Sequence, residues 1–272
     1  MGKHRIRAVV AFLVGFIFLF PLYLVIVNSV KPEDQIVGSP ATLPFPPTLD
    51  HYAAVLTRGD NLVWEGLQNS TIITVSSVLL AMIISAMFAF ALWRSSSVVQ
   101  NFAYGILLAG LILPTAVILV PVFKVLQAIG LANSMPGLVL FMVGYYVPFG
   151  TFVFRAFLTT VPRELVDAAM VDGAGPATTF FRIVFPLMRP ATASVVVIIG
   201  VWVWNDFLNP LILLGPLSGT TIMVGLYRSV GQFAIDFGEL FAFMLLASLP
   251  IVILYFLLQS QFVRGLTSGA AK

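Results

Sequence analysis

VDAAMVDGAGPATTFFRIVFP, residues 166–186, is a patch of small and charged side chains in a chain that is 60% hydrophobic. Pro162, just before it, marks the first turn of a helix, and Pro176 opens a second helix after an Asp-Gly turn. Gly173 and Gly175 permit the positive φ angles that such a turn needs. The stretch therefore predicts a helix-turn-helix elbow of about thirty residues.

We expect the first helix of this elbow to cover residues 163–171 and the second to end before Pro186. Small side chains such as Ala168 and Ala169 let another backbone approach closely. The elbow is shaped to fill a groove on another protein. A loop that only joins two membrane spans fits the same residues.

The composition around the elbow excludes an ordinary soluble domain. About a quarter of the residues of a soluble domain are charged, whereas this chain has 9% charged residues and 24 Phe among 272 residues. We therefore expect an all-α integral membrane protein; a very apolar soluble lipid-binding protein is the alternative. The absence of cysteine excludes disulfides, thiolate metal sites and cysteine nucleophiles.

Six runs are apolar enough to cross a membrane, since a span needs about 20 apolar residues. The fifth run contains one acid, Asp206. The first resembles a secretory signal, but it is too long and has no small-x-small cleavage site, so we expect it to stay attached. The predicted spans are residues 8–27, 69–93, 102–123, 136–154, 191–214 and 240–263.

The positions of Lys and Arg predict that both termini and the elbow are cytoplasmic. This orientation places ten of the fourteen basic residues inside. The net charge of +3 is then a topology signal and not a nucleic-acid footprint. The inside residues are Lys3, Arg5, Arg7, Arg94, Arg155, Arg163, Arg182, Arg189, Arg264 and Lys272, and the outside residues are Lys31, Arg58, Lys124 and Arg228.

Two segments are predicted to lie outside the membrane on the outer side. Residues 30–68 form the longest such segment, and their proline-rich stretch SPATLPFPPTLDHY is not expected to be a regular helix. This segment either meets an external partner or shields the helix ends. KVLQAIGLANS, residues 124–134, is predicted as a short helix that ends at Gly130.

Two patterns predict how the spans pack. Small residues recur every four positions along one face of the second run, which predicts a packing stripe against another helix. Pro114 and Pro121 predict a bend or break in the third run, and a broken helix either lines a cavity or simply packs. The stripe consists of Ser77, Ala81, Ser85 and Ala89.

Polar residues inside the fifth run are candidates for a translocation pathway. Asp206 lies about 22 Å along a helix that starts at residue 191, and polar groups at such depth face a cavity or a partner helix. A sugar path needs hydrogen-bond acceptors and aromatic faces. Anchoring at the outer interface, or bonding to a partner permease, explains the same residues. The candidates are Trp204, Asn205, Asp206 and Asn209, with Trp202 beside them.

The elbow also contains residues at a fixed spacing. They are Asp167-Ala168-Ala169, then Gly173 after three residues, Ile183 after nine more, and Phe185-Pro186 after one. This spacing resembles the EAA motif of ABC importer permeases, whose pattern is Glu-Ala-Ala, then Gly, then Ile-x-Leu-Pro. The chain departs from it at Asp167, which keeps the charge, and at Phe185, which keeps the apolar bulk.

Other segments between residues 111 and 272 are similar to the MalG-type carbohydrate permeases. They are LPTAVILVPVF (113–123), GLANSMPGLVL (130–140), VPFGTFVFRAF (147–157), WNDFLNPLILL (204–214) and GLTSGAAK (265–272). The resemblance implies a single MetI-like permease domain over residues 1–272, with six transmembrane helices and a cytoplasmic coupling loop at 160–186.

The resemblance implies that this chain is not an enzyme and has no cofactor of its own, with ATP and Mg²⁺ bound by a separate ATPase. The elbow would then be the coupling helix, seated in a cleft of that ATPase, and the tail at 265–272 would either reach the ATPase interface or be a frayed end. The implied coupling residues are Glu164, Asp167, Ala168, Ala169, Asp172, Gly173, Ile183 and Pro186.

The implied partners are a second, non-identical permease, an ABC ATPase dimer, an extracytoplasmic solute-binding protein and membrane lipid, with no nucleic acid. The resemblance favours a sugar or oligosaccharide as cargo. A non-sugar solute such as a glycerol phosphate ester is the alternative.

Functions of other classes lack their key residues. An ion-coupled secondary transporter is expected to carry an acid near mid-span and often an internal repeat; the runs contain only the off-centre Asp206 and no repeat is detected. An intramembrane hydrolase needs a base, and both histidines, His4 and His51, fall outside the runs. The only Gly-Lys pair, Gly2-Lys3, does not form a phosphate loop.

Overall fold

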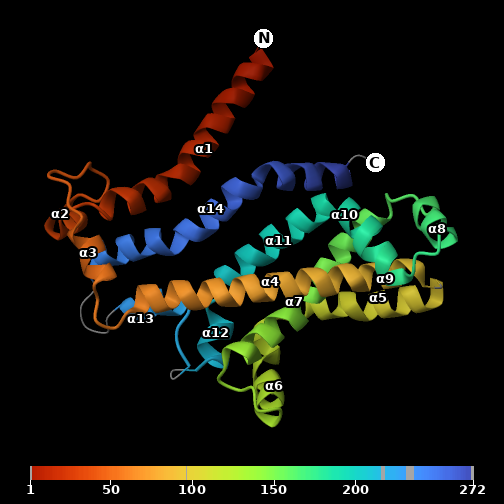
Figure 1. The fold of residues 1–272 in the computed structure, drawn as a ribbon. Helices are drawn as coiled ribbons and strands as arrows, with labels where there is room; N and C mark the ends of the chain where they lie inside the picture. Colours follow the sequence, from red (N-terminus) through yellow and green to blue (C-terminus); the bar gives the residue numbers. More distant parts are fainter. Residues whose placement is uncertain (1, 96, 216–217, 231–235, 271–272) are drawn as a thin grey trace. The chain divides into compact units, whose positions relative to one another are not determined.

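The computed structural model describes residues 2–95, 97–215, 218–230 and 236–270, and within these residues every regular element is a helix (Figure 1). The chain divides into two compact units, each described by itself. Unit 1 comprises Met1–Leu67 and Ile222–Pro250, and unit 2 comprises Gln68–Thr221 and Ile251–Lys272. The long helices α4 (Leu62–Arg94) and α14 (Phe237–Ala270) each run through both units. That residues 1–272 act as one permease domain stays a prediction.

Unit 1 contains α1 (Gly2–Asn28), two short helices, α2 (Glu33–Gly38) and α3 (Asp50–Leu56), and α13 (Ile222–Ser229), with the first turns of α4 and α14. The proline-rich segment is irregular from residue 39 to 49, as predicted, but its last three residues belong to α3. A Cβ at Gly66 would lie 2.9 Å from the Ile222 backbone. The start of α4 therefore packs against α13 with almost no space between the backbones.

The polar residues that join α1 to α2 are tightly held. The ammonium group of Lys31, which is fully buried, donates a hydrogen bond to the Ser39 carbonyl at 2.8 Å, and burial lowers the pKa of this group. The Tyr52 hydroxyl donates to Ser29 Oγ at 2.8 Å. These bonds connect the end of α1 to α3 without any regular structure between residues 39 and 49.

Unit 2 is built around α4, α7 (Met135–Leu158) and α11 (Arg189–Trp204), with α5 (Ser97–Ile112) packed on α7. The small residues at 77, 81, 85 and 89 are all fully buried. The Ser85 hydroxyl donates to the Val147 carbonyl on α7 at 3.1 Å, and a Cβ at Gly150 would lie 2.4 Å from Ser85 Oγ. The predicted packing stripe is therefore confirmed, and α7 is its partner.

Four of the six predicted spans are continuous helices of sufficient length and apolar character. They are Arg7–Asn28, Leu62–Arg94, Met135–Leu158 and Phe237–Leu257. They correspond to the predicted runs 8–27, 69–93, 136–154 and 240–263. The side chains of the tail at 265–272 lie outside the described ones, so its contact with the ATPase stays a prediction.

The other two predicted spans are not single straight helices. The run 102–123 is broken at Leu113-Pro114, where α5 and α6 (Thr115–Ala128) meet at 106°. Pro114 causes this break because its ring fixes φ and the residue before a proline avoids helical angles. Pro121, in contrast, lies inside the continuous helix α6. Residues 124–128 are the last residues of α6, so the prediction of a separate short helix there is wrong, but Gly130 follows the end of α6 with φ +73°.

The run 191–214 is also wrong as one helix. The helix α11 ends at Trp204, and α12 (Leu208–Leu213) starts after a break at residues 205–207. Asp206 therefore lies in this break and not within a helix. α12 packs on α6 and α7. Among the described residues, four helices are continuous candidate spans, and two bent pairs raise the number to as many as six. The second of these pairs joins Pro176–Leu187 to α11 at 78° and does not include α12.

Candidate functional site

The predicted elbow forms at residues 164–187 (Figure 1). Its first arm is α8 (Glu164–Val171), and Gly173 follows with φ +82°. The amides of Ala174 and Gly173 donate to the carbonyls of Ala169 and Met170 at 2.9 and 3.0 Å. This is a Schellman cap, which satisfies the last carbonyls of a helix and needs a left-handed residue at its centre. Gly173 is therefore required by the turn, as predicted.

The second arm differs from the prediction. Pro176 opens α9 (Pro176–Thr179), as expected, but Gly175 before it has φ −67° and needs no left-handed conformation. The helix does not end before Pro186, because a π-helical turn, η1 (Phe180–Val184), leads directly into α10 (Phe185–Leu187). Pro186 is tolerated because it sits in the first turn of α10, where its missing N–H costs nothing.

The inner side of the elbow is fixed to the end of α4. Val166 and Ala169 are buried, and the Arg163 guanidinium lies 5.4 Å above the Trp93 ring. Arg94 Nη2 lies 3.3 Å from Met170 Sδ. Cation–π contacts of this kind are worth about 0.5–1 kcal/mol at exposed sites. Arginines from both elements thus hold α8 against α4.

The second arm is fixed to the same helix by aromatic packing. The ring of Phe180 lies 5.4 Å from that of Phe90 on α4, and Phe180 and Val184 are buried. Both arms of the elbow therefore contact the last turns of α4.

The outer side of the elbow carries apolar and acidic side chains together. Val171 is 88% exposed and Leu165 is 45% exposed. Leu165, Ala168 and Asp172 lie three and four residues apart on α8, so they share one face. Sequence reasoning named the acids and alanines but missed Leu165 and Val171. Their exposure is visible only in the structure, where the opposite side of α8 is buried.

The structure places the predicted coupling residues unevenly. Ala169 is buried against this chain and Ile183 is half-buried, so neither belongs to the open face of the elbow. The exposed ones are Glu164, Asp167, Ala168, Asp172, Gly173 and Pro186.

A second feature of unit 2 is a cavity of about 790 Å³ beside the break between α11 and α12. Aromatic rings from two helices form its wall. Trp202 stacks on Tyr146 with centroids 5.7 Å apart, and Phe149 meets the Trp202 ring edge-on at 4.7 Å. Tyr145 hydrogen bonds to the Leu113 carbonyl at the α5–α6 break, at 3.2 Å.

The cavity lining also includes polar side chains at the break between α11 and α12. Asp206 accepts a hydrogen bond from the Asn209 amide at 3.2 Å and another from the Asn209 side chain, so it caps the start of α12. The Asn205 side chain donates to the Val201 carbonyl at 2.9 Å. Among the described residues, Asn209 Oδ1 is buried without a hydrogen-bond partner. The break in the helix thus places carboxylate and amide groups against aromatic rings.

Three of the four predicted pathway residues line this cavity, namely Asn205, Asp206 and Asn209, and Trp202 lines it as well. Trp204 does not line it and is 4% exposed, since it points to the buried side of α11. Tyr145, Tyr146 and Phe149 were missed. Their spacing of three and four residues on α7 was the available signal. Leu111 and Thr115, on either side of the Pro114 break, also contribute to the lining.

Residues 77–268 match the model of a protein family described as the binding-protein-dependent transport system inner membrane component. The chain belongs to this family. Membership confirms the prediction of an importer permease, and with its apolar helices it makes the chain a multi-pass membrane protein.

Members of this family with assigned cargo are similar over nearly the whole chain. The multiple sugar-binding transport system permease protein MsmG of Streptococcus mutans is 34% identical over 95% of this chain and 93% of its own length. The diacetylchitobiose uptake system permease protein NgcG of Streptomyces coelicolor is 32% identical over 93% and 84%. The melibiose/raffinose/stachyose import permease protein MelC of Bacillus subtilis is 30% identical over 98% and 96%.

A solved structure has a similar fold. The crystal structure of a bacterial ABC transporter involved in the import of the acidic polysaccharide alginate contains a chain that matches with a TM-score of 0.83, at 19% identity over 96% of both chains. At this identity the likeness shows a common fold.

Proposed function

We propose that this chain forms one half of the translocation pathway of an ABC importer for a sugar or oligosaccharide. The other half is a second, non-identical permease, and ATP and Mg²⁺ are bound by an ABC ATPase dimer. An extracytoplasmic solute-binding protein delivers the cargo. The family and the sugar-permease relatives support this proposal.

The proposed topology has six crossings and both termini in the cytoplasm. The crossings are α1, α4, the bent pair α5–α6, α7, α11 and α14. By length and composition α11 passes as a span only together with Pro176–Leu187, from which it is bent by 78°. Arg94 and Arg163 support this orientation because both lie where the elbow meets α4, and basic residues are enriched on the cytoplasmic side. The elbow is then cytoplasmic.

The observation that carries the proposed coupling is the two-sided elbow. Its inner side is packed against α4, and its outer side exposes Leu165 and Val171 beside acids. An exposed apolar surface rimmed by polar groups marks an interaction site. We assign this surface to the ATPase. Closure of the ATPase around ATP must favour the outward-facing state of the permease, because contact alone shifts no equilibrium.

The cavity supports a neutral sugar as cargo. Its aromatic faces suit the apolar faces of sugar rings, and its acceptors at Asn205 and Asp206 suit hydroxyl groups. Its volume falls within the range of small-molecule sites. Asp206 is the single charged side chain in this lining. A phosphate ester would be repelled by this carboxylate, so the glycerol phosphate alternative is less favoured.

An ion-coupled secondary transporter remains the candidate of another class. Only Asp206 favours this function, and its carboxylate already accepts hydrogen bonds from Asn209 at the start of α12. Collapsing the ion gradients across proteoliposomes distinguishes the two functions. The proposed importer continues to take up cargo as long as ATP is present inside.

The coupling surface is tested by replacing Val171 with aspartate in the complete importer, reconstituted with its ATPase and binding protein. We expect the ATPase to be lost from the purified complex and binding-protein-stimulated ATP hydrolysis to fall. Val37→Asp is the matched control, since Val37 is 72% exposed on α2 in unit 1. If Val171→Asp and Val37→Asp both retain the ATPase and full stimulation, the elbow is not the coupling surface.

A further inference from the structure

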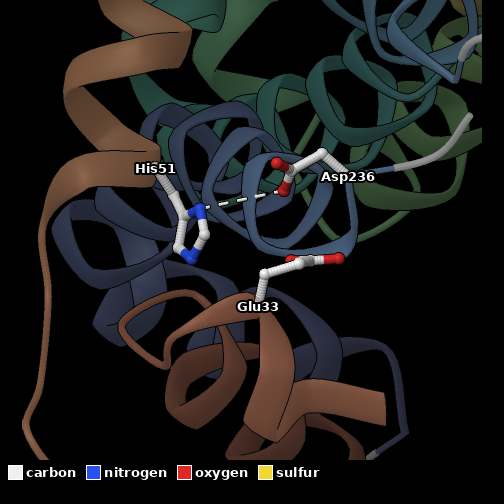
Figure 2. Close-up of side chains that lie close together, drawn as sticks. All are labelled: Glu33, His51 and Asp236. Carbon is white, nitrogen blue, oxygen red and sulfur yellow. Dashed lines mark ion pairs between the residues drawn. The ribbon is translucent and has the colours of Figure 1, made fainter.

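Three side chains of unit 1, none of which belongs to the elbow or lines the cavity, lie close together (Figure 2). Glu33 begins α2, His51 lies in the first turn of α3, and Asp236 directly precedes α14. One ligand atom from each of the three lies within 4.8 Å of the others. We propose that Glu33, His51 and Asp236 bind a divalent transition-metal ion, for which Zn²⁺ is the best match. This site does not depend on the proposed transport function.

The hydrogen bonds of His51 leave one ring nitrogen available to a metal. Nε2 lies 2.8 Å from the Lys31 carbonyl oxygen, which can only accept, so Nε2 carries the proton. In the neutral ring Nδ1 then has a lone pair. The His51 residue is 8% exposed, and Nδ1 points toward the Asp236 carboxylate (Figure 2). Metal-binding histidines typically donate their other N–H to a carbonyl or carboxylate in this manner.

The separation of His51 and Asp236 fits two ligands of one ion better than a direct bond. His51 Nδ1 lies 3.7 Å from Asp236 Oδ1. A hydrogen bond between nitrogen and oxygen spans about 2.7–3.2 Å. Two donors bound to one tetrahedral zinc ion, each about 2.0–2.2 Å from the metal, lie about 3.3–3.6 Å apart. A small approach of the Asp236 side chain, which is 46% exposed, gives the coordinated geometry.

The backbone of α14 holds the other two ligands in position. A Cβ at Gly238 would lie 2.1–2.4 Å from three atoms of the His51 ring, so the ring packs flat against a position where only glycine fits. The Glu33 carboxylate accepts from the amides of Phe237 and Gly238 at 3.1 and 3.0 Å. Ligands whose orientation is fixed by such contacts lose little freedom on binding an ion.

The charges around the cluster also favour a cation. The two carboxylates attract a cation, and the amides at the start of α14 offset this attraction only in part. The Lys31 ammonium does not neutralise these carboxylates, because it donates to the Ser39 and Pro40 carbonyls. The Arg58 guanidinium pairs instead with the carboxylate of Asp60, at 2.9 Å, and with that of Glu239, at 3.8 Å. An imidazole nitrogen beside carboxylates suits Zn²⁺, whereas Ca²⁺ and Mg²⁺ prefer oxygen alone.

Such an ion would join the segment between α1 and α4 to the start of α14. Its three ligands come from three elements far apart in sequence, so binding would stabilise the folded arrangement of unit 1 over the unfolded chain.

The test is zinc binding by the complete purified importer, prepared without a histidine tag and stripped with a chelator. We expect each copy of this chain to bind a single Zn²⁺ ion in competition with a chromophoric chelator, while excess Mg²⁺ or Ca²⁺ does not displace it. Glu33→Gln, His51→Gln and Asp236→Asn should each weaken the affinity by about tenfold or more. Asp34→Asn is the matched control, since Asp34 is exposed on α2 next to Glu33 and outside the cluster.

Two results overturn the proposal. One is the absence of zinc binding by the wild-type complex, and the other is binding that the three ligand variants leave unchanged, which indicates adventitious binding elsewhere. A thermal melt in the presence of chelator shows whether each variant is folded. If His51→Gln does not fold, Asp236→Asn decides the question, because the exposed Asp236 side chain contributes little to the core.

Discussion

Replacing Gly173 with alanine isolates the conformational requirement of the elbow. Gly173 has φ +82°, and nothing lies within 4 Å of a Cβ built at this position. Alanine therefore meets no steric obstacle from neighbours and pays only for the left-handed backbone, about 1–2 kcal/mol. The Schellman cap opens when residue 173 leaves this conformation. The population of elbows with an open turn should rise by about 5–30-fold.

Gly175 provides a control two residues away. A Cβ at Gly175 also has nothing within 4 Å, but its φ of −67° suits any residue. Gly175→Ala should leave the turn unchanged or stabilise it by about 0.4–1 kcal/mol, because alanine restricts the unfolded chain. The two variants add the same methyl group to the same loop, and only the backbone angle differs between them.

The measurement is amide hydrogen exchange of α8 in the purified importer, together with ATP-driven uptake in proteoliposomes. Gly173→Ala should accelerate exchange in α8 by about 5–30-fold and lower uptake, with membrane insertion preserved. Asparagine, which visits the left-handed region more readily than alanine, should fall between glycine and alanine. Equal exchange rates in Gly173→Ala and Gly175→Ala would refute the reasoning, since they would show that the cap does not hold the elbow.

Three further predictions concern packing and the cavity. Gly150→Ala drives a methyl group against Ser85 and should destabilise the protein by about 1–3 kcal/mol in unfolding titrations; adding Ser85→Gly should restore part of this loss, and strictly additive effects would contradict the close approach. Asp206→Asn keeps the ability to cap α12 but removes the charge, so we expect a higher KM for sugar uptake at an unchanged melting temperature; an unchanged KM would exclude Asp206 from cargo binding. Trp202→Ala should weaken uptake more than Trp202→Phe, which keeps an aromatic ring against Tyr146; equal losses would argue against stacking.

The parts of the fold that depend on local backbone chemistry were predictable from the sequence. The break at Pro114 was expected from the ring of proline, although Pro121 shows that a proline can also lie within a continuous helix. Gly173 permits a left-handed turn without help from other residues. The stripe of small residues that includes Ser85 was also predictable, because its four-residue period is a property of one helix. The helix that packs on this stripe was not predictable, since the contact with α7 depends on long-range packing.

The errors arose where a boundary depends on surrounding contacts. The second arm of the elbow continues through Pro186 because of the π-helical turn and the burial of Phe180. No single residue in the sequence indicates this continuation. The end of α11 at Trp204 was hidden in an apolar run. Trp202 lines the cavity and Trp204 is buried, and composition alone does not distinguish the two tryptophans.

The π-helical turn η1 contains one residue more than an α-helical turn would need. Each residue of an α-helix advances the chain by about 100° around its axis. A turn closed by i→i+5 bonds takes up its additional residue within the turn itself, so deleting a single residue between Phe180 and Val184 would leave an α-helical turn with the segments on either side in nearly the same phase. The inserted residue therefore shifts the sequence period of the buried positions between the second arm and α10 without turning one segment relative to the other.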